Sequence, residues 1–199
     1  MRRTLFIDGS NLYGGLTDLL KPGEYFDFAE LLEILEEDLF VTGVMFYGTF
    51  MKIDSSKPNT YRLRVLAQKA FFNSAKNHPK VTFYQGHFSG AGKEKGVDVR
   101  LAVDMAVGAA INEYDEAIIM SGDADLQYCV EKAVDFRKKV YLAALASRFP
   151  FGTAVLVERR FIYDIRGFFL NNILPEYRGK RQGLRIRELL DTLEIKKVK

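Results

Sequence analysis

The sequence has few of the residues that build disulfide scaffolds or transition-metal sites. Its 199 residues include one cysteine and two histidines, His78 and His87. One cysteine cannot form an internal disulfide, and Cys129 has no Cys or His neighbour at the spacing of a zinc site. These absences exclude a secreted disulfide scaffold and a histidine-rich metal centre. Any metal bound here would be a hard ion held by oxygen atoms.

Long apolar runs are absent as well. Only three apolar residues, Leu5 to Ile7, precede the first carboxylate, too few for the core of a signal peptide. No stretch approaches the ~18 apolar residues of a membrane span. Hydrophobic residues nevertheless make up 48% of the chain, which is enough for a core and excludes a disordered chain. We therefore expect a soluble, cytoplasmic protein with no membrane partner.

Charge is distributed unevenly along the chain. Residues 178–199 hold eight Lys or Arg against three Asp or Glu, a net +5, which leaves −2 for residues 1–177 of the total of +3. A basic end on a near-neutral body fits a polyanionic partner, and a solubilising tail is the alternative. We expect one domain over 1–177, followed by a basic tail over 178–199 with a helix over 184–193.

Short apolar runs alternate with segments of helical periodicity through most of the chain. The expected strands are 5–7, 41–50, 81–84, 117–120 and 140–145, and the expected helices are 28–39, 58–71, 98–111 and 124–137. This alternation predicts an α/β fold with three layers, in which helices cover both faces of a central, mainly parallel sheet. The glycine-rich stretch 85–96 is predicted to be a flexible basic loop.

Four aspartates lie where strands end or a helix begins. Asp8 follows the first strand, Asp123 and Asp125 follow the fourth, and Asp98 starts the helix after the basic loop. Ligands of parallel sheets bind beyond the carboxyl ends of the strands, so we expect these carboxylates to converge. Their mutual repulsion raises their pKa values and is relieved by a divalent cation. Carboxylates without Cys or His favour Mg²⁺ or Mn²⁺, ions that serve phosphoryl chemistry.

Each aspartate also has an ordinary structural explanation. Asp123 can cap a turn or a helix, and Asp98 can be a first-turn acid that the helix dipole favours. Asp104 lies about 120° around the helix from Asp98 at ~100° per residue, so we expect it to serve structure. The joint placement of Asp8, Asp98, Asp123 and Asp125, rather than any one of them, supports a site.

Three blocks of the sequence resemble the signature blocks of NYN domains. They are Phe6-Ile7-Asp8-Gly9-Ser10-Asn11, Lys95-Gly96-Val97-Asp98-Val99 and Ser121-Gly122-Asp123-Ala124-Asp125-Leu126. They are most similar to the LabA-like branch, within the PIN-like nuclease superfamily, and the resemblance covers roughly residues 3–146. It implies an α/β/α fold, an acidic pocket that binds Mg²⁺ or Mn²⁺, and ribonuclease activity.

The resemblance also assigns roles by position. Asp8, Asp98 and Asp123 match the metal-holding acids of the family, Asp125 matches the fourth, and Asn11 matches the polar residue after the first acid. The chain has alanine where the third block usually has serine, and leucine where it usually has an aromatic residue. Neither departure removes a carboxylate.

The expected function is therefore a metal-dependent ribonuclease that hydrolyses phosphodiester bonds of single-stranded RNA. Its catalytic and metal-binding residues are the four aspartates, and its expected substrate-binding residues are Asn11, Ser121, Lys93, Lys95 and Arg100. Tyr13 and Phe88 can stack on bases, with core or loop packing as the alternative. Whether the chain forms a homodimer stays open.

A different function class stays open beside this one. A non-catalytic RNA-binding or regulatory module could retain the acidic pocket. An aspartyl phosphatase is disfavoured, because it would need a second Asp where the chain has Ser10. A dinucleotide-binding oxidoreductase is disfavoured too, because no Gly-x-Gly-x-x-Gly follows the first strand.

Overall fold

The computed structural model describes residues 1–17, 19–145, 168–170 and 193–199. A short 3₁₀ turn over Ala124–Leu126 precedes the helix over Gln127–Asp135. In chain order the other elements are β1 (Arg3–Asp8), α1 (Gly9–Leu16), β2 (Glu24–Tyr25), α2 (Phe28–Leu39), β3 (Gly43–Gly48), α3 (Asn59–Lys76), β4 (Val81–Gln85), β5 (His87–Phe88), β6 (Glu94–Lys95), α4 (Val97–Ala110), β7 (Glu116–Met120), α5 (Gln127–Asp135), β8 (Lys139–Leu145), β9 (Phe168–Leu170) and β10 (Lys196–Lys197).

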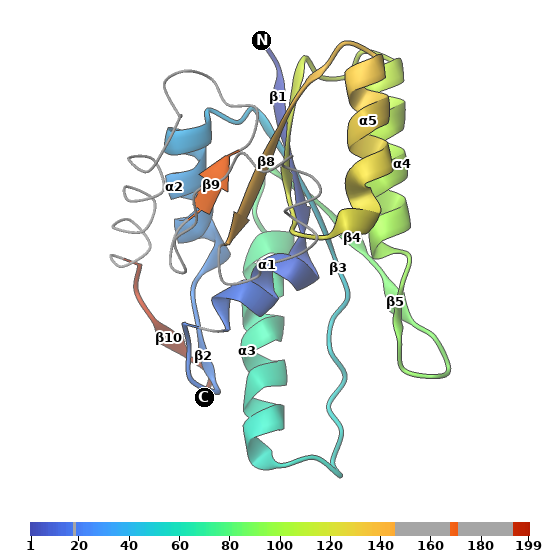
Figure 1. Ribbon diagram of the computed structural model, residues 1–199. Helices are drawn as coiled ribbons and strands as arrows, with labels where there is room; N and C mark the ends of the chain where they lie inside the picture. Colours follow the sequence, from blue (N-terminus) through green and yellow to red (C-terminus); the bar gives the residue numbers. More distant parts are fainter. Residues whose placement is uncertain (18, 146–167, 171–192) are drawn as a thin grey trace.

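The main sheet has the strand order β4-β3-β1-β7-β8-β9. Its first five strands are parallel, and β9 pairs antiparallel with β8. Helices α4 and α5 lie together on one face of the sheet, and α1, α2 and α3 lie on the other (Figure 1). The predicted three-layer α/β fold with a mainly parallel sheet is confirmed.

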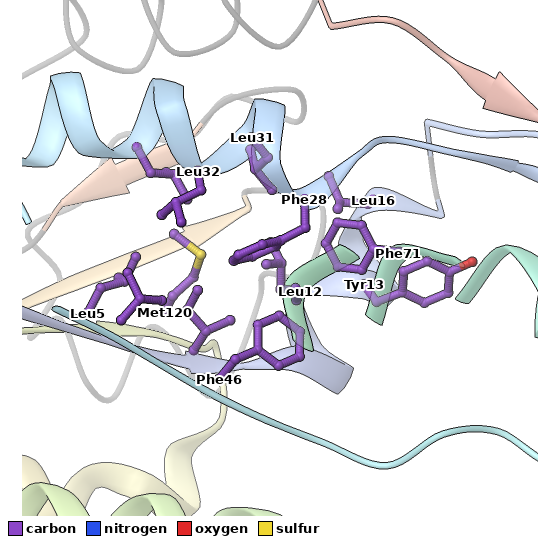
Figure 2. Close-up of a cluster of buried hydrophobic side chains, with 14 of the residues drawn as sticks. Leu5, Leu12, Tyr13, Leu16, Phe28, Leu31, Leu32, Phe46, Phe71 and Met120 are labelled. Atoms are coloured by element: carbon purple, nitrogen blue, oxygen red, sulfur yellow. The ribbon is translucent and has the colours of Figure 1, made fainter. Parts of the chain in front are cut away.

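Each face of the sheet has its own hydrophobic core. Side chains alternate along β1, so Leu5 and Ile7 join the cluster under α1, α2 and α3, while Phe6 joins the cluster under α4 and α5. Figure 2 shows the first cluster, in which the Phe28 and Phe46 rings pack edge to face with centroids 5.2 Å apart. Two covered faces explain why the central strands are short and almost wholly apolar.

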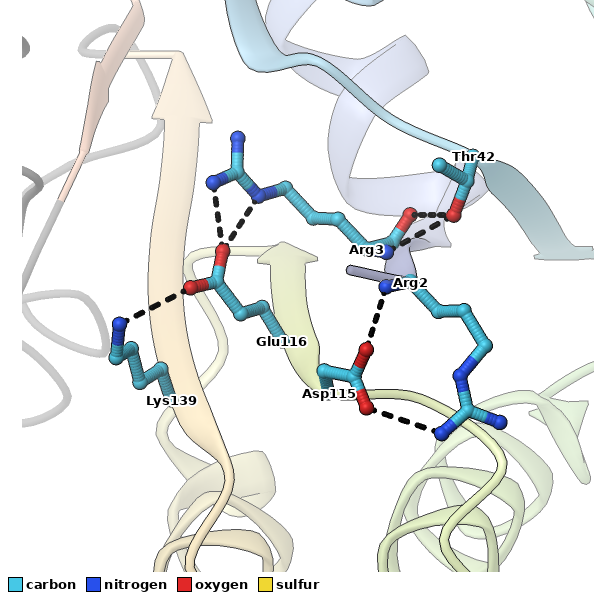
Figure 3. Close-up of polar contacts among 6 residues, drawn as sticks. All are labelled: Arg2, Arg3, Thr42, Asp115, Glu116 and Lys139. Carbon is cyan, nitrogen blue, oxygen red and sulfur yellow. Dashed lines mark hydrogen bonds and ion pairs between the residues drawn. The ribbon is translucent and has the colours of Figure 1, made fainter.

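Ion pairs join β1 and β7 at the amino ends of the strands (Figure 3). Arg3 and Glu116 are both buried, with Nη2 of the arginine 2.6 Å from Oε2 of the glutamate. Lys139 Nζ lies 3.3 Å from the other glutamate oxygen. Nearby, Asp115 accepts hydrogen bonds from the Arg2 backbone N–H and guanidinium, which hold the pKa of Asp115 at about 2. Every carboxylate of this group therefore has a cationic partner.

Helix α1 follows β1 directly, because the Asp8 carboxylate caps that helix. One local feature differs from the sequence prediction. The predicted loop over 85–96 contains the hairpin of β5 and β6. At its start, a Cβ on Gly86 would lie 2.4 Å from Thr49 Oγ1 and 2.9 Å from the Lys95 carbonyl oxygen. The hairpin can pack this closely against the sheet only because residue 86 is glycine.

The end of the chain pairs with the domain rather than standing apart from it. Strand β10 pairs antiparallel with β2, and Lys196 Nζ lies 3.0 Å from Asp27 and 2.7 Å from Glu30. Residues 184–192 of the predicted tail helix lie outside the described residues, and the boundary at residue 177 stays a prediction. None of the helices in the described ranges has the length and apolar character needed to cross a membrane.

Candidate functional site

Asp8 is the centre of the site at the carboxyl ends of the strands. It is the last residue of β1 and the N-cap of α1, and it is 4% exposed. One carboxylate oxygen accepts a hydrogen bond from the Asn11 N–H at 3.0 Å, and the other accepts one from the Ser121 hydroxyl at 2.9 Å. These two bonds fix the orientation of the carboxylate at the junction of β1, α1 and the segment after β7.

The Asp8 carboxylate has hydrogen-bond donors but no cation. Among the described residues, no lysine or arginine forms an ion pair with it. The pKa of Asp8 is raised from 3.8 to about 6, chiefly by burial and also by the charges of Asp98 and Glu94, against the lowering effect of the two hydrogen bonds. Such a shift marks a charge that the protein itself does not compensate.

Asp98 brings a second segment to the same place. It lies in the first turn of α4, behind Gly96, which adopts a positive φ of 86° and gives no side-chain cap. Partial burial raises the pKa of Asp98, and the charges of Asp123, Glu94 and Asp125 raise it as well. Asp98 therefore lies within electrostatic range of carboxylates from three other segments, those of Asp8, of Glu94 and of the Asp123–Asp125 turn.

Asp123 has a structural role in addition to its place near Asp98. Its Oδ1 accepts a hydrogen bond from the Asp125 N–H at 2.9 Å, and its own N–H donates to Ser121 Oγ at 3.1 Å. This is the turn-capping role given above as its alternative. Asp125 is exposed at the rim. The carboxylates of both residues face the charge on Asp98.

Asn11 and Ser121 join the segments that carry the acids. The Asn11 side-chain oxygen accepts a hydrogen bond from the Gly122 N–H at 3.1 Å. The Ser121 hydroxyl donates to Asp8 and accepts from the backbone of Asp123. Both side chains are thus engaged in positioning the site, and their predicted contact with substrate stays a prediction.

Glu94 is a site residue that the sequence analysis did not single out. It lies on β6, and its carboxylate accepts a hydrogen bond from the Ser10 hydroxyl, with oxygens at 2.9 and 3.1 Å. Its charge contributes to the raised pKa values of both Asp8 and Asp98. The only sign of it in the sequence is a carboxylate between two lysines, four residues before Asp98.

The predicted basic residues differ in how free they are to bind a phosphate. Lys93 and Lys95 are exposed on the hairpin. Arg100 is engaged, because its Nε lies 2.8 Å from Asp104 Oδ2 and its guanidinium stacks on the Tyr84 ring at 4.6 Å. Asp104 accepts hydrogen bonds from Arg100 and from the Tyr47 hydroxyl, in agreement with the structural role expected for it.

The two candidate stacking aromatics lie in different environments. Tyr13 is 7% exposed and packs in the core, with its ring centroid 5.5 Å from that of Phe71, which confirms the packing alternative. Phe88 is half-buried on the hairpin, with Lys52 Nζ 5.8 Å from its ring centroid.

The donor set fits a hard divalent ion. All the side chains that converge here offer carboxylate, amide or hydroxyl oxygens, the ligands of Mg²⁺ and Mn²⁺. Within the described ranges, no three His, Cys, Asp or Glu side chains are close enough to hold a metal directly as they stand. The fit therefore depends on donor chemistry and uncompensated charge. It suits an ion that keeps several water ligands, as Mg²⁺ does.

Comparison with known proteins agrees with this architecture. The model of the NYN domain matches residues 2–165, and no curated protein matches the chain. The structure is similar to that of T5 5′-exonuclease with bound zinc, with a TM-score of 0.52 and 15% identity over 83% of this chain and 63% of that one. At this identity the likeness shows the fold alone.

A second solved structure is a more distant match. It is a protein of unknown function from Vibrio parahaemolyticus RIMD 2210633, with a TM-score of 0.46 and 19% identity over 77% of this chain and 86% of that one. The LabA-like branch expected from the sequence stays a prediction.

Proposed function

Because the chain belongs to the NYN domain family, we propose that it is a metal-dependent ribonuclease. It hydrolyses phosphodiester bonds of single-stranded RNA in the cytoplasm, with Mg²⁺ or Mn²⁺ bound by Asp8, Asp98, Asp123 and Asp125. The observation that carries the proposal is the buried Asp8 carboxylate, which lies at the end of the central strand and faces other carboxylates without a cation. A divalent ion is the simplest group that would relieve this repulsion.

The residues of the chain have distinct roles in this proposal. Asp8 is the fixed ligand, since Asn11 and Ser121 hold both of its oxygens. Asp98 and Asp123 approach from other elements and can adjust, because both are more exposed. When bound, the metal supplies Lewis-acid activation of water and neutralises charge on the phosphate.

Two further observations support a nuclease. T5 5′-exonuclease, whose fold is similar, is by name a nuclease and was seen with divalent metal ions bound. Lys93 and Lys95 lie exposed on the hairpin that also carries Glu94, where they can attract a polyanion to an otherwise acidic site. Arg100 would have to leave Asp104 to contact substrate.

The test is cleavage of a fluorescent single-stranded RNA of 20 nucleotides with Mn²⁺, Mg²⁺ or EDTA. We expect Asp8→Asn to lower the rate more than about 100-fold, since loss of even an outer partner of a metal ligand costs about 10- to 100-fold. Asp135→Asn is the matched control, because Asp135 is exposed on α5, where it pairs with Lys132. Equal rates for the wild type and Asp8→Asn would overturn the proposal.

A non-catalytic RNA-binding or regulatory module is the second candidate. One observation favours it: as they stand, no three carboxylates of the described residues are close enough to hold a metal directly. The same assay separates the two, because this candidate predicts RNA binding by the wild type with no cleavage in either Mg²⁺ or Mn²⁺.

A further inference from the structure

A cavity of about 350 Å³ lies beside the acidic site. It is open to solvent on one side and is lined by residues of α1, of α3, of the segment after β3 and of the β5–β6 hairpin, including Ser10, Thr17, Met51, Arg64, Phe88 and Glu94. This volume is at the lower end of the range of small-molecule sites, about 300–1,000 Å³. It suits a single monomer unit of a chain rather than an extended segment.

The cavity and the acidic site have one wall in common. That wall is the hydrogen-bonded pair of Ser10 and Glu94. On one side of it the Glu94 charge acts on Asp8 and Asp98, and on the other side both residues line the cavity. A ligand in the cavity is therefore adjacent to the place where the carboxylates converge.

The lining of the cavity also includes a cation, Arg64. Arg64 is exposed on α3, and among the described residues no carboxylate forms an ion pair with it. A second cation lies near the lining, because Lys52 Nζ is 5.8 Å from the centroid of the Phe88 ring. A guanidinium with unused donors is the side chain best suited to bind a phosphate through two hydrogen bonds.

The remaining wall is apolar and firmly held. Phe88 and Met51 contribute an aromatic and a thioether surface. The buried Gln68 amide fixes the segment behind them, because its oxygen accepts from the Met51 N–H at 2.9 Å and its nitrogen donates to the Thr49 carbonyl at 3.0 Å. The cavity thus has a preformed wall, a flat ring and a cation on one side.

We propose that this cavity binds one nucleotide of the RNA strand next to the bond that is cleaved. Arg64 binds a phosphate, and the base packs against Phe88. Glu94 and Ser10 separate this nucleotide from the metal site. The inference depends on the proposed function for its ligand, but the binding itself needs neither a metal nor cleavage.

The test is binding of a fluorescein-labelled ten-nucleotide oligouridylate to the full chain in EDTA, measured by anisotropy. We expect Arg64→Gln and Phe88→Ala each to weaken binding about 10-fold, within the range measured for loss of one stacked base. The matched controls are Arg62→Gln, an exposed arginine two residues away, and Phe136→Ala, which is 48% exposed outside the cavity. Both controls should stay within twofold of the wild type, and thermal unfolding checks that all variants fold.

Each result has a definite meaning. If Arg64→Gln weakens binding no more than Arg62→Gln, the arginine acts only through general charge and the subsite is refuted. If Phe88→Ala binds like Phe136→Ala, the base does not pack against Phe88 and the proposal is overturned in that part. Loss of binding in both cavity variants, with no cleavage by the wild type, would support the subsite and refute the nuclease. Cleavage by the wild type, together with unchanged binding in both cavity variants, would support the nuclease and refute the subsite.

Discussion

The two ends of strands β1 and β7 bury carboxylates in opposite environments. At the amino ends, Glu116 is buried against Arg3 at 2.6 Å, with Lys139 on its other oxygen. At the carboxyl ends, Asp8 is buried to a similar degree, but it faces the charges of Asp98 and Glu94, and no described lysine or arginine forms an ion pair with it. A carboxylate buried beside a cation has its charge neutralised within the protein. A carboxylate buried beside other carboxylates keeps a charge that a ligand must neutralise.

The largest effect is expected from removing the cation at the amino ends. Arg3→Met leaves the Glu116 charge buried without its main partner, which should lower the free energy of unfolding by about 3–5 kcal/mol. Urea denaturation measures this loss. The double variant Arg3→Met with Glu116→Leu should recover much of it, since an apolar pair of similar volume is tolerated. A loss in the single variant below about 1 kcal/mol would show that the pair is not a structural requirement.

At the carboxyl ends, removal of the buried acid by Asp8→Asn should stabilise the metal-free protein. The pKa of Asp8 is about 6 in the folded state against 3.8, so the folded state binds the proton more tightly. The free energy of unfolding therefore falls as the pH rises from about 4 to about 6, by an amount on the order of 3 kcal/mol. In EDTA, Asp8→Asn should lack this loss, should be more stable than the wild type at pH 7 and should match it below pH 4.

Urea denaturation at pH 4, 5, 6 and 7 measures this difference, and Asp135→Asn is the control. If the stability of the wild type and that of Asp8→Asn depend on pH in the same way, the Asp8 charge is already neutralised by a cation within the protein.

Glu94 allows a finer test of the acidic end. Glu94→Gln retains an oxygen for the Ser10 hydroxyl but removes one of the charges that face Asp8 and Asp98. We expect Mn²⁺ affinity, measured by titration calorimetry, to fall about 10-fold, the size of effect typical of outer partners of a metal site. Glu113→Gln, an exposed acid elsewhere, should bind as the wild type does. Unchanged Mn²⁺ affinity in Glu94→Gln would show that Glu94 serves to hold the hairpin through Ser10 and does not affect the metal.

The smallest effect is expected from the exposed pair at the amino ends. Arg2 and Asp115 lie 3.0 Å apart with side chains 51% and 40% exposed. Arg2→Ala should therefore cost less than about 1 kcal/mol, and the cost should shrink further in high salt. The pKa of Asp115 should rise from about 2 toward its usual range, which an NMR titration follows. A larger loss of unfolding free energy in Arg2→Ala would contradict the expected difference in strength between exposed and buried ion pairs.

The layers of the fold were predictable because they depend on local patterns. Helix α2 spans Phe28–Leu39, as its apolar spacing predicted, and five apolar runs became the five parallel strands. The β5–β6 hairpin was not predictable, since its short strands lie among glycines and lysines without any periodicity. Its formation depends on close packing of Gly86 against Thr49, a contact between distant parts of the chain.

The same distinction applies to the site. Asp8 could be predicted because a carboxylate directly after a buried parallel strand lies at the carboxyl edge of the sheet, where ligands bind. Glu94 and Arg64 could not, because each acts through a partner or a cavity that only the folded hairpin and α3 create. Lys196 shows the converse: it is one of the cations that suggested a polyanion-binding tail, yet it pairs with Asp27 and Glu30.

The most direct test of the acidic end is anomalous diffraction from crystals grown with MnCl₂. We expect an anomalous peak about 2.1 Å from a carboxylate oxygen of Asp8, with Asp98 or Asp123 as a second contact, direct or through water. A map with no peak beside Asp8 at saturating Mn²⁺, or with Asp8 paired to a lysine or arginine instead, would contradict this expectation.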